Sequence, residues 1–188
     1  MQNLIKQLES YQAINAQEEK DRQQFLSLLN NNDESLYTRE NKTAHITASA
    51  WITNKTRNKI LLAHHNIYNS WAWLGGHADG EMDLSKVAIK EAKEESGLKD
   101  IKLLSNDIAS IEILPVGGHI KHGEYVSAHL HLNITYFLVA DENETLHNKA
   151  DENSAVAWFD INEVVSKSNE AWIAENIYQK LNDKLIKL

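Results

Sequence analysis

Apolar residues recur at helical spacing through residues 1–30, where Leu4, Ile5 and Leu8 are followed by Phe25 and Leu29. No proline or glycine interrupts this stretch, so the pattern predicts one or two helices that end near residues 30–33. We treat residues 1–40 as an N-terminal helical extension, since its amphipathic pattern is typical of a packing or dimerisation element. A homodimer formed through this extension is therefore one expectation.

From residue 44 the pattern changes to short segments rich in β-branched and aromatic residues. We predict strands over residues 45–51, 59–65, 71–74, 101–104, 110–116, 129–140 and 156–159. The segment 129–140 alternates most clearly, because Leu130 and Leu132 share one face while His129 and His131 share the other. Strands before and after a central helix predict a mixed sheet sandwiched by helices, an α/β fold of the α+β type.

Three helices are predicted beyond the extension. One lies between Asp83, a plausible N-cap, and Gly97, which stands where a left-handed residue ends a helix. A second follows Asp160, which we expect to be an N-cap with Glu163 completing a capping box. The last is the amphipathic segment 169–187.

The central helix places acidic residues on its apolar side. At about 100° per residue, Glu91, Glu94 and Glu95 fall within the apolar stripe, and the lysines take the opposite side. A charge run in a helix is usually a solvated face, but inward carboxylates repel one another and are costly to desolvate unless a cation neutralises them. Because all-oxygen ligands suit Mg²⁺ or Mn²⁺ better than zinc, this helix predicts a site for such a metal.

A glycine-rich loop precedes this helix. Gly75 and Gly76 follow directly on a predicted strand, where glycine lets the backbone turn sharply, approach a ligand closely and leave a carbonyl free to coordinate a metal. His77 lies in the same loop, and we expect it to touch a substrate phosphate. The loop therefore supports the prediction of a metal and phosphate site.

The segment from Gly76 to Leu98 resembles the signature box of the Nudix hydrolases, most specifically in its closing Glu-x-x-Glu-Glu-x-Gly-Leu over residues 91–98. A weaker similarity extends over about residues 43–187. The resemblance implies a Nudix-type α/β/α sandwich over residues 41–188. It also implies hydrolysis of a nucleoside diphosphate linked to another moiety, such as ADP-ribose, a nucleotide sugar or a nucleoside triphosphate, by attack of water at phosphorus.

The resemblance also implies roles for individual residues. Glu91 and Glu95 correspond to core metal ligands, Glu94 to a further ligand or the general base, and the Gly75 carbonyl to a backbone ligand for Mg²⁺ or Mn²⁺. Which glutamate acts as the base stays open, with Glu91 also a candidate. Glu152, in the polar stretch before the last predicted strand, is the best candidate outside the box.

Substrate contacts are expected from Gly76, His77, Lys90, His129 and His131. The spacing of His129 and His131 on one strand face could also bind zinc, but no third ligand at a metal-like spacing accompanies them. A polar sheet face that is packed under a helix or that lines a substrate cleft is therefore the simpler interpretation of the histidines.

Two positions depart from the resembled pattern. Met82 and Lys90 stand where the family has a glutamate and an arginine, with Glu81 next to the first of these positions. This departure supports a second hypothesis, a catalytically silent Nudix domain that binds a nucleotide as a sensor. A third, isopentenyl diphosphate isomerase chemistry, calls for a cysteine, and the chain has none.

The amino-acid composition limits the kinds of partner that the protein can bind. The 188 residues include 19 Lys and Arg against 27 Asp and Glu, a formal net charge of −8, which argues against nucleic acid and anionic membranes as partners. A small anionic nucleotide is still compatible, provided that bound cations receive it. No apolar run is long enough to span a bilayer, and the polar N-terminus is unlike a signal peptide, so we expect a cytoplasmic protein.

Overall fold

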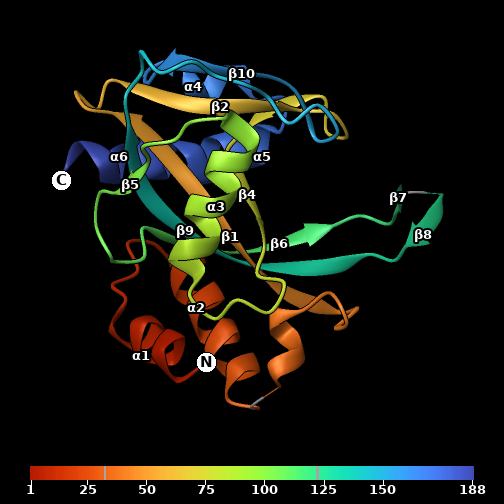
Figure 1. Ribbon diagram of the computed structural model, residues 1–188. Coiled ribbons are helices and arrows are strands. Elements are labelled where there is room, and N and C mark those ends of the chain that lie inside the picture. Colours follow the sequence, from red (N-terminus) through yellow and green to blue (C-terminus); the bar gives the residue numbers. More distant parts are fainter. Residues whose placement is uncertain (32, 122) are drawn as a thin grey trace.

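The computed structural model describes residues 1–31, 33–121 and 123–188 (Figure 1). The chain begins with two helices, as the periodicity predicts: α1 (Gln2–Ser10) and α2 (Ala16–Leu29). Asn15 caps α2, because its side chain accepts a hydrogen bond from the backbone N–H of Glu18. A short 3₁₀ helix, η1 (Glu34–Tyr37), then leads into the sheet.

The sheet is mixed, as predicted. Its strands are β1 (Ala44–Asn54), β2 (Lys59–His65), β3 (Ser70–Ala72), β4 (Leu74–His77), β5 (Lys102–Leu103), β6 (Ser110–Val116), β9 (His129–Ala140) and β10 (Asn153–Asp160). The main order is β10-β2-β1-β9-β5, with β3 on β2, β4 on β1 and β6 on β9. Only β1 and β9 run parallel among these described pairs. A separate hairpin, β7 (His119–Lys121) and β8 (Glu124–Val126), projects from the body, and His122 lies outside the described residues.

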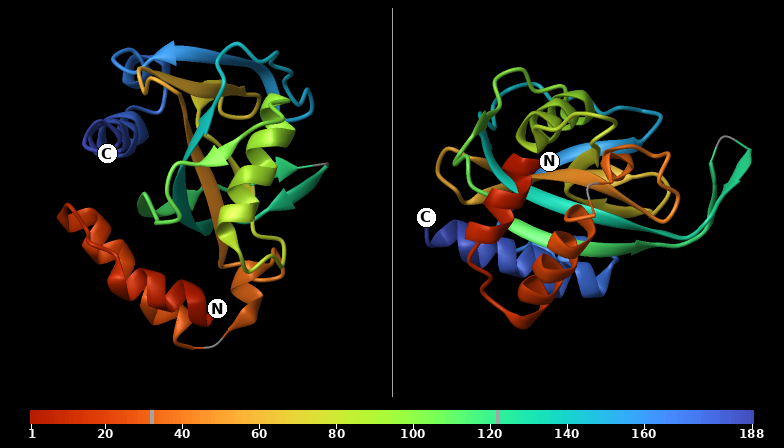
Figure 2. Two further views of the ribbon diagram at one scale, coloured as in Figure 1. Left: turned by 60° about the vertical axis from the view of Figure 1, so that its left-hand side comes forward. Right: turned by 90° about the horizontal axis from the view of Figure 1, so that it is seen from below.

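Helices cover both faces of the sheet, which confirms the α/β/α sandwich (Figure 2). Helix α3 (Leu84–Ser96) lies on one face. On the other lies a continuous helical segment made of α5 (Ala171–Ile173), a π-helical turn η2 (Ala174–Tyr178) and α6 (Gln179–Ile186), preceded by the short α4 (Val164–Lys167). None of the helices in the described residues has the length and apolar character that a membrane crossing needs.

Alternation along the strands divides the interior into two cores. On β1, Ile46 and Ala48 pack into the core beneath α3, whereas Trp51 packs on the opposite face with Ile177 and Leu181 of the C-terminal helical segment. The face toward α6 is apolar only along part of its extent. Toward the N-terminal end of β1 it carries polar side chains, His45, Thr47 and Ser49.

The N-terminal extension packs against the domain. Leu4, Leu8 and Phe25 are almost fully buried in the same core as the β1 residues. Beside them lies a buried ionic cluster that joins α2, β6 and α6, with Glu18, Lys180, Lys184 and Glu112 as its members. The extension is thus continuous with the packing of the domain, and the homodimer stays a prediction.

Two local predictions are wrong. The capping box at Asp160 and Glu163 does not form, because α4 begins only at Val164, and Asp160 instead accepts a hydrogen bond from the backbone N–H of Asn162 in a turn after β10. Gly75 and Gly76 continue the strand β4 and pair with Ser49 and Ala48. A Cβ atom at Gly75 would lie 2.5 Å from the carbonyl oxygen of Ala48, so glycine here serves close strand packing.

Candidate active site

Helix α3 carries the acidic residues of the predicted site. It starts after Asp83 and ends at Gly97, whose φ of 73° is the left-handed conformation that glycine adopts without strain. Glu91 and Glu95 are buried on its inner side, as the helical pattern predicts. Glu94 is not: its side chain is 42% exposed, because it stands at the margin of the apolar stripe and turns toward solvent.

Glu95 is held from two directions. Its Oε1 accepts a hydrogen bond of 2.9 Å from the backbone N–H of Gly75, and its Oε2 accepts one of 2.8 Å from the side-chain amide of Asn153. Burial nevertheless raises the pKa of Glu95 to about 7, and the nearby charges of Glu152 and Glu91 act in the same direction. A bound cation would offset this burial and favour the carboxylate form.

Glu91 lies directly against β4. A Cβ atom at Gly76 would stand 2.6 Å from the carboxyl carbon of Glu91, so only glycine lets the strand approach this carboxylate. One oxygen of Glu91 is 3.2 Å from Nζ of Lys90, and Lys90 also lies 3.7 Å from Glu94. Gly76 is therefore needed for the position of Glu91, and its expected contact with substrate stays a prediction.

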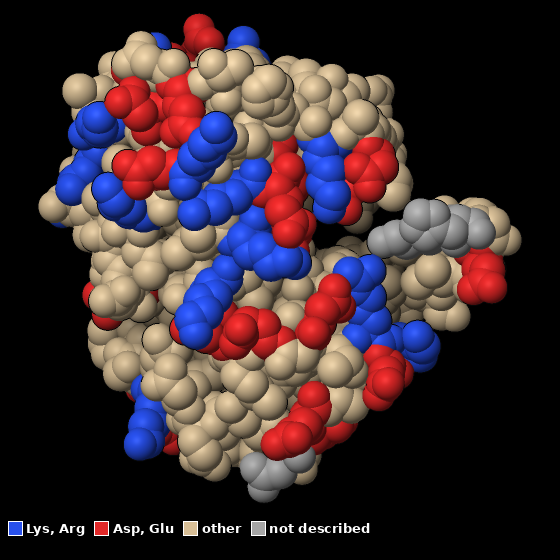
Figure 3. All heavy atoms as spheres, in the orientation of Figure 1, with Lys and Arg blue, Asp and Glu red and all other residues tan. Residues whose placement is uncertain are grey.

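The loop before β10 brings Glu152 to the same place. Nζ of Lys149 is 3.0 Å from Glu152 and 3.8 Å from Glu94, and the next residue after Glu152 is the Asn153 that binds Glu95. Basic and acidic side chains accordingly interleave over this face of the molecule (Figure 3). Within the described residues, no three of these carboxylates have oxygens within 4.8 Å of one another, and two lysines pair with them.

The carboxylates of this arrangement could hold a hard divalent cation once their oxygens move closer together than they stand here. Glu91 and Glu95 offer carboxylate oxygens from the buried side of α3, and Glu94 and Glu152 offer theirs from partly exposed positions. An all-oxygen set of this kind is typical of Mg²⁺ or Mn²⁺. The burial of two carboxylates, Glu91 and Glu95, on the inner side of α3 is the observation that most favours a cation here.

A basic residue that the sequence analysis did not include among the site residues lies beside this site. Arg39 donates two hydrogen bonds, of 2.8 and 2.6 Å, to the carboxylate of Asp79 in the loop before α3. It is also close enough to Glu91 and Glu152 for their charges to raise its pKa. No local pattern marks Arg39, because the contact joins segments 40 residues apart.

The candidate histidines lie across the sheet from these carboxylates. Because side chains alternate along a strand, His77 takes the face opposite to the one on which Gly76 meets Glu91. His131 lies on that same opposite face, where burial lowers its pKa to about 2 with a further contribution from neighbouring histidines. His131 is therefore neutral at ordinary pH.

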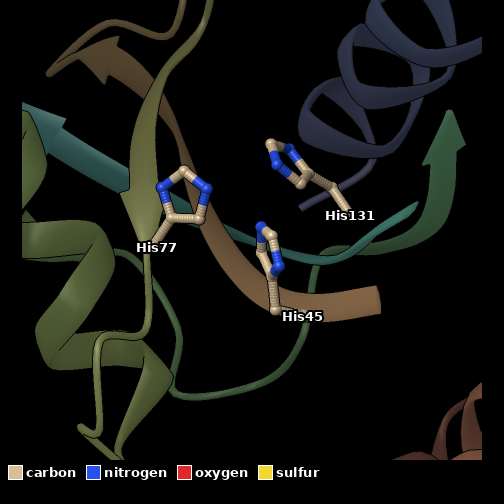
Figure 4. A group of neighbouring side chains, drawn as sticks. All are labelled: His45, His77 and His131. Carbon is tan, nitrogen blue, oxygen red and sulfur yellow. The ribbon is translucent and has the colours of Figure 1, made fainter. Parts of the chain in front are cut away.

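The sequence spacing implies no third ligand beside His129 and His131, but the sheet brings two distant histidines next to His131. His45, His77 and His131 each bring a ring nitrogen within 4.8 Å of the others (Figure 4). They come from β1, β4 and β9, whose pairing no sequence spacing reveals. The polar alternation of His45, Thr47 and Ser49 was the signal that could have identified His45.

Comparisons with known proteins agree with the fold and the box. A family model of the NUDIX domain matches residues 43–181. The chain therefore belongs to the Nudix family of hydrolases. A search of curated protein sequences finds no match.

Several solved structures share this fold. An Ap4A hydrolase from C. elegans superposes with a TM-score of 0.56 and 17% identity, over 76% of this chain and 98% of that one. The Nudix hydrolase RenU from M. smegmatis gives 0.56 and 15%, over 77% and 87%. The E. coli dihydroneopterin triphosphate pyrophosphohydrolase gives 0.54 and 14%, over 76% and 96%. At these identities the likeness concerns the fold alone.

Proposed function

We propose that this protein is a Mg²⁺- or Mn²⁺-dependent hydrolase that cleaves the pyrophosphate bond of a nucleoside diphosphate linked to another moiety. One observation carries the proposal: two buried glutamates of α3, Glu91 and Glu95, lie against the glycines of β4. The names of the structural neighbours, an Ap4A hydrolase and a triphosphate pyrophosphohydrolase, support the same substrate class.

Glu91, Glu94, Glu95 and the Gly75 carbonyl would hold the metal. When bound, the ion supplies positive charge to the phosphate oxygens and lowers the pKa of water for in-line attack. The water oxygen would form a bond to one phosphorus as the bridging P–O bond breaks. A diphosphate diester would give two phosphate monoesters, and a nucleoside triphosphate would give a nucleotide and an inorganic phosphate or pyrophosphate. Phosphorus chemistry of this kind depends mainly on positioning and charge, which this cluster of side chains provides.

A glutamate must accept the proton of the attacking water. Glu94 and Glu152 are the better placed candidates, since both side chains are partly exposed, whereas Glu91 is nearly buried and pairs with Lys90. The pH–rate profiles of Glu94→Gln and Glu152→Gln distinguish them. Loss of the acidic limb of the profile in one variant identifies the base.

Positive side chains around the cluster suit the diphosphate. Lys90, Lys149 and Arg39 are each within reach of the carboxylates and would contact phosphate oxygens that the metal leaves uncovered. His77, His129 and His131 stay proposed substrate contacts, but they lie on the sheet face opposite the glutamates of α3, so they would meet a part of the substrate away from the carboxylates.

The base or leaving group has a candidate location. A small surface pocket is lined by Ile67, Tyr68, Val116, Gly117, Gly118 and His119. Tyr68 is 50% exposed, so its ring is available to stack on a nucleobase, an interaction that buries one aromatic face of each partner.

The test is a substrate panel. ADP-ribose, nucleotide sugars and nucleoside triphosphates are incubated with the protein with and without Mg²⁺. The released phosphate monoesters are measured, together with inorganic phosphate and pyrophosphate from the triphosphates. We expect turnover only with metal, and its loss in Glu95→Gln. Glu175→Gln, an exposed substitution on the C-terminal helix, is the matched control and should keep full activity. Turnover without metal, or an active Glu95→Gln, contradicts the proposal.

One observation favours a second function. Lys90 pairs with Glu91 and Glu94, and Lys149 with Glu94 and Glu152. These ammonium groups already offset part of the carboxylate charge without a metal, which favours a domain that binds a nucleotide as a sensor and does not hydrolyse it. A sensor would gain thermal stability from a nucleotide, because a ligand that binds only the native state raises its stability, and would show no turnover over hours.

A further inference from the structure

We propose that His45, His77 and His131 form a binding site for a divalent transition metal ion, Zn²⁺ by ligand type, on the sheet face opposite the glutamates of α3. The site is built from three strands of the sheet (Figure 4). It is separate from the carboxylate site in both position and ligand chemistry.

The register of the sheet brings the three rings together. The parallel pairing of β1 and β9 sets His45 directly beside His131, and the antiparallel pairing of β1 and β4 sets His77 beside Thr47. The ring centroids form a nearly equilateral triangle, with sides of 4.9 Å from His45 to His77, 4.9 Å from His77 to His131 and 5.1 Å from His45 to His131. Because strands hold each backbone, the triangle is rigid apart from ring rotation.

His45 is oriented as a metal ligand is. Its Nδ1 lies 3.1 Å from the backbone carbonyl oxygen of Asn41, so that nitrogen carries the proton and donates it, and Nε2 keeps its lone pair. That Nε2 is buried and has no hydrogen-bond partner, and the residue is only 6% exposed. Figure 4 shows the ring of His45 reaching from β1 toward the other two rings. A carbonyl that holds one ring nitrogen while the other is presented to an ion is the usual environment of a ligating histidine.

His129 repeats this arrangement at the edge of the cluster. Its Nδ1 lies 2.8 Å from the carbonyl oxygen of Ser127, and its Nε2 lies 3.3 Å from Nε2 of His131. Zn–N bonds of about 2.0–2.1 Å in a tetrahedron place two ligand nitrogens about 3.4 Å apart. The observed spacing is close to that of two zinc ligands, but it is also that of a hydrogen bond between the two rings, so His129 stands at the edge of the site and outside the three histidines whose nitrogens all lie within 4.8 Å of one another.

The donor set decides the class of ion. Neutral imidazoles suit zinc and its neighbours in the first transition row, whereas Mg²⁺ requires oxygen ligands. Histidine nitrogens within 4.8 Å of one another need only small ring movements to reach a common ion. The same residues could instead contact substrate alone, and the experiment separates the two.

The experiment is a calorimetric titration of the chelator-treated full chain with Zn²⁺ in excess Mg²⁺, which occupies the carboxylates. We expect one equivalent of zinc to bind. The affinity for zinc should fall at least about 100-fold in each of three variants, His45→Ala, His77→Ala and His131→Ala. Even the loss of a group that only orients a ligand lowers metal affinity about 10–100-fold. His64→Ala is the matched control: its ring hydrogen-bonds Ser154 on another part of the sheet, and its zinc affinity should not change.

Glu95→Gln should also keep its zinc affinity, so failure of the proposed hydrolase and failure of this site are distinguishable. Co²⁺ bound to the unaltered protein gives an independent readout, because tetrahedral nitrogen ligation produces intense visible absorption and octahedral oxygen ligation does not. This measurement stands even where a histidine variant fails to fold, which circular dichroism detects. No zinc binding by the unaltered chain, equal binding by all three variants, or a weak octahedral cobalt spectrum overturns the proposal.

Discussion

Replacing Glu18 by glutamine tests whether the N-terminal helices are an integral part of the folded domain. Glu18 is fully buried, and its Oε1 lies 2.6 Å from Lys184 and 3.2 Å from Lys180. Lys180 in turn lies 3.1 Å from Glu112 on β6. The two carboxylates and two ammonium groups balance, so the glutamine leaves one buried positive charge uncompensated.

The expected loss of stability is large. Removing one partner of a buried ion pair costs about 3–5 kcal/mol, since the remaining charge stays desolvated. For a domain of this size, each kcal/mol of lost stability lowers the melting temperature by about 2–4 °C. The midpoint of thermal unfolding should therefore fall by roughly 10 °C. Urea unfolding followed by circular dichroism measures the change, with the slope against urea concentration unaltered if the native fold is kept.

The dependence on pH provides a second readout. Burial acts to raise the pKa of Glu18, but Lys180 and Lys184 outweigh it and hold that pKa below the ordinary value of 4.5. A carboxyl with a lowered native pKa stabilises the fold above its unfolded pKa, and this contribution is lost as the pH falls through the native pKa. The difference in the free energy of unfolding between the unaltered protein and Glu18→Gln should therefore be largest at pH 7 and should shrink below about pH 4.5.

The neighbouring residue supplies the control. Glu19 pairs with Arg22 at 2.8 Å on a partly exposed side of the same helix. Glu19→Gln should leave the melting temperature much less changed than Glu18→Gln does, because ion pairs that water can reach contribute little. Combining Glu18→Gln with Lys184→Met should recover part of the loss by removing the unpaired charge. Equal, small effects of Glu18→Gln and Glu19→Gln would refute the integral packing of the extension.

Two further substitutions probe the carboxylate site. Gly76→Ala should displace the carboxylate of Glu91, whose carboxyl carbon a Cβ atom would approach to 2.6 Å, and so abolish metal-dependent turnover. Glu175→Gln, an exposed substitution on the C-terminal helical segment, should be silent in the same assay. Asn153→Ala removes the amide that donates a hydrogen bond to Glu95. The affinity for Mg²⁺, measured by calorimetry, should fall about 10–100-fold, and an unchanged affinity would contradict this prediction.

The sequence by itself determined most of the local structure. The strand 129–140 and the end of α3 at Gly97 were both predictable, because period-two alternation and a left-handed glycine are local signals. The inward positions of Glu91 and Glu95 also followed from helical geometry alone. The failure of the capping box after Asp160 could not be predicted from the sequence, because a turn after β10 satisfies the same Asp160 side chain.

The tertiary structure decided which distant residues meet. Glu152 and Asn153 reach α3 only through the path of the loop before β10, and Glu18 finds its lysines only when α2 packs beside α6. The histidine triangle depends on strand register, which pairs His45 with a residue 86 positions further along the chain, His131. Helical and strand periodicities report only neighbours within one element, so contacts between elements follow from how the whole sheet assembles.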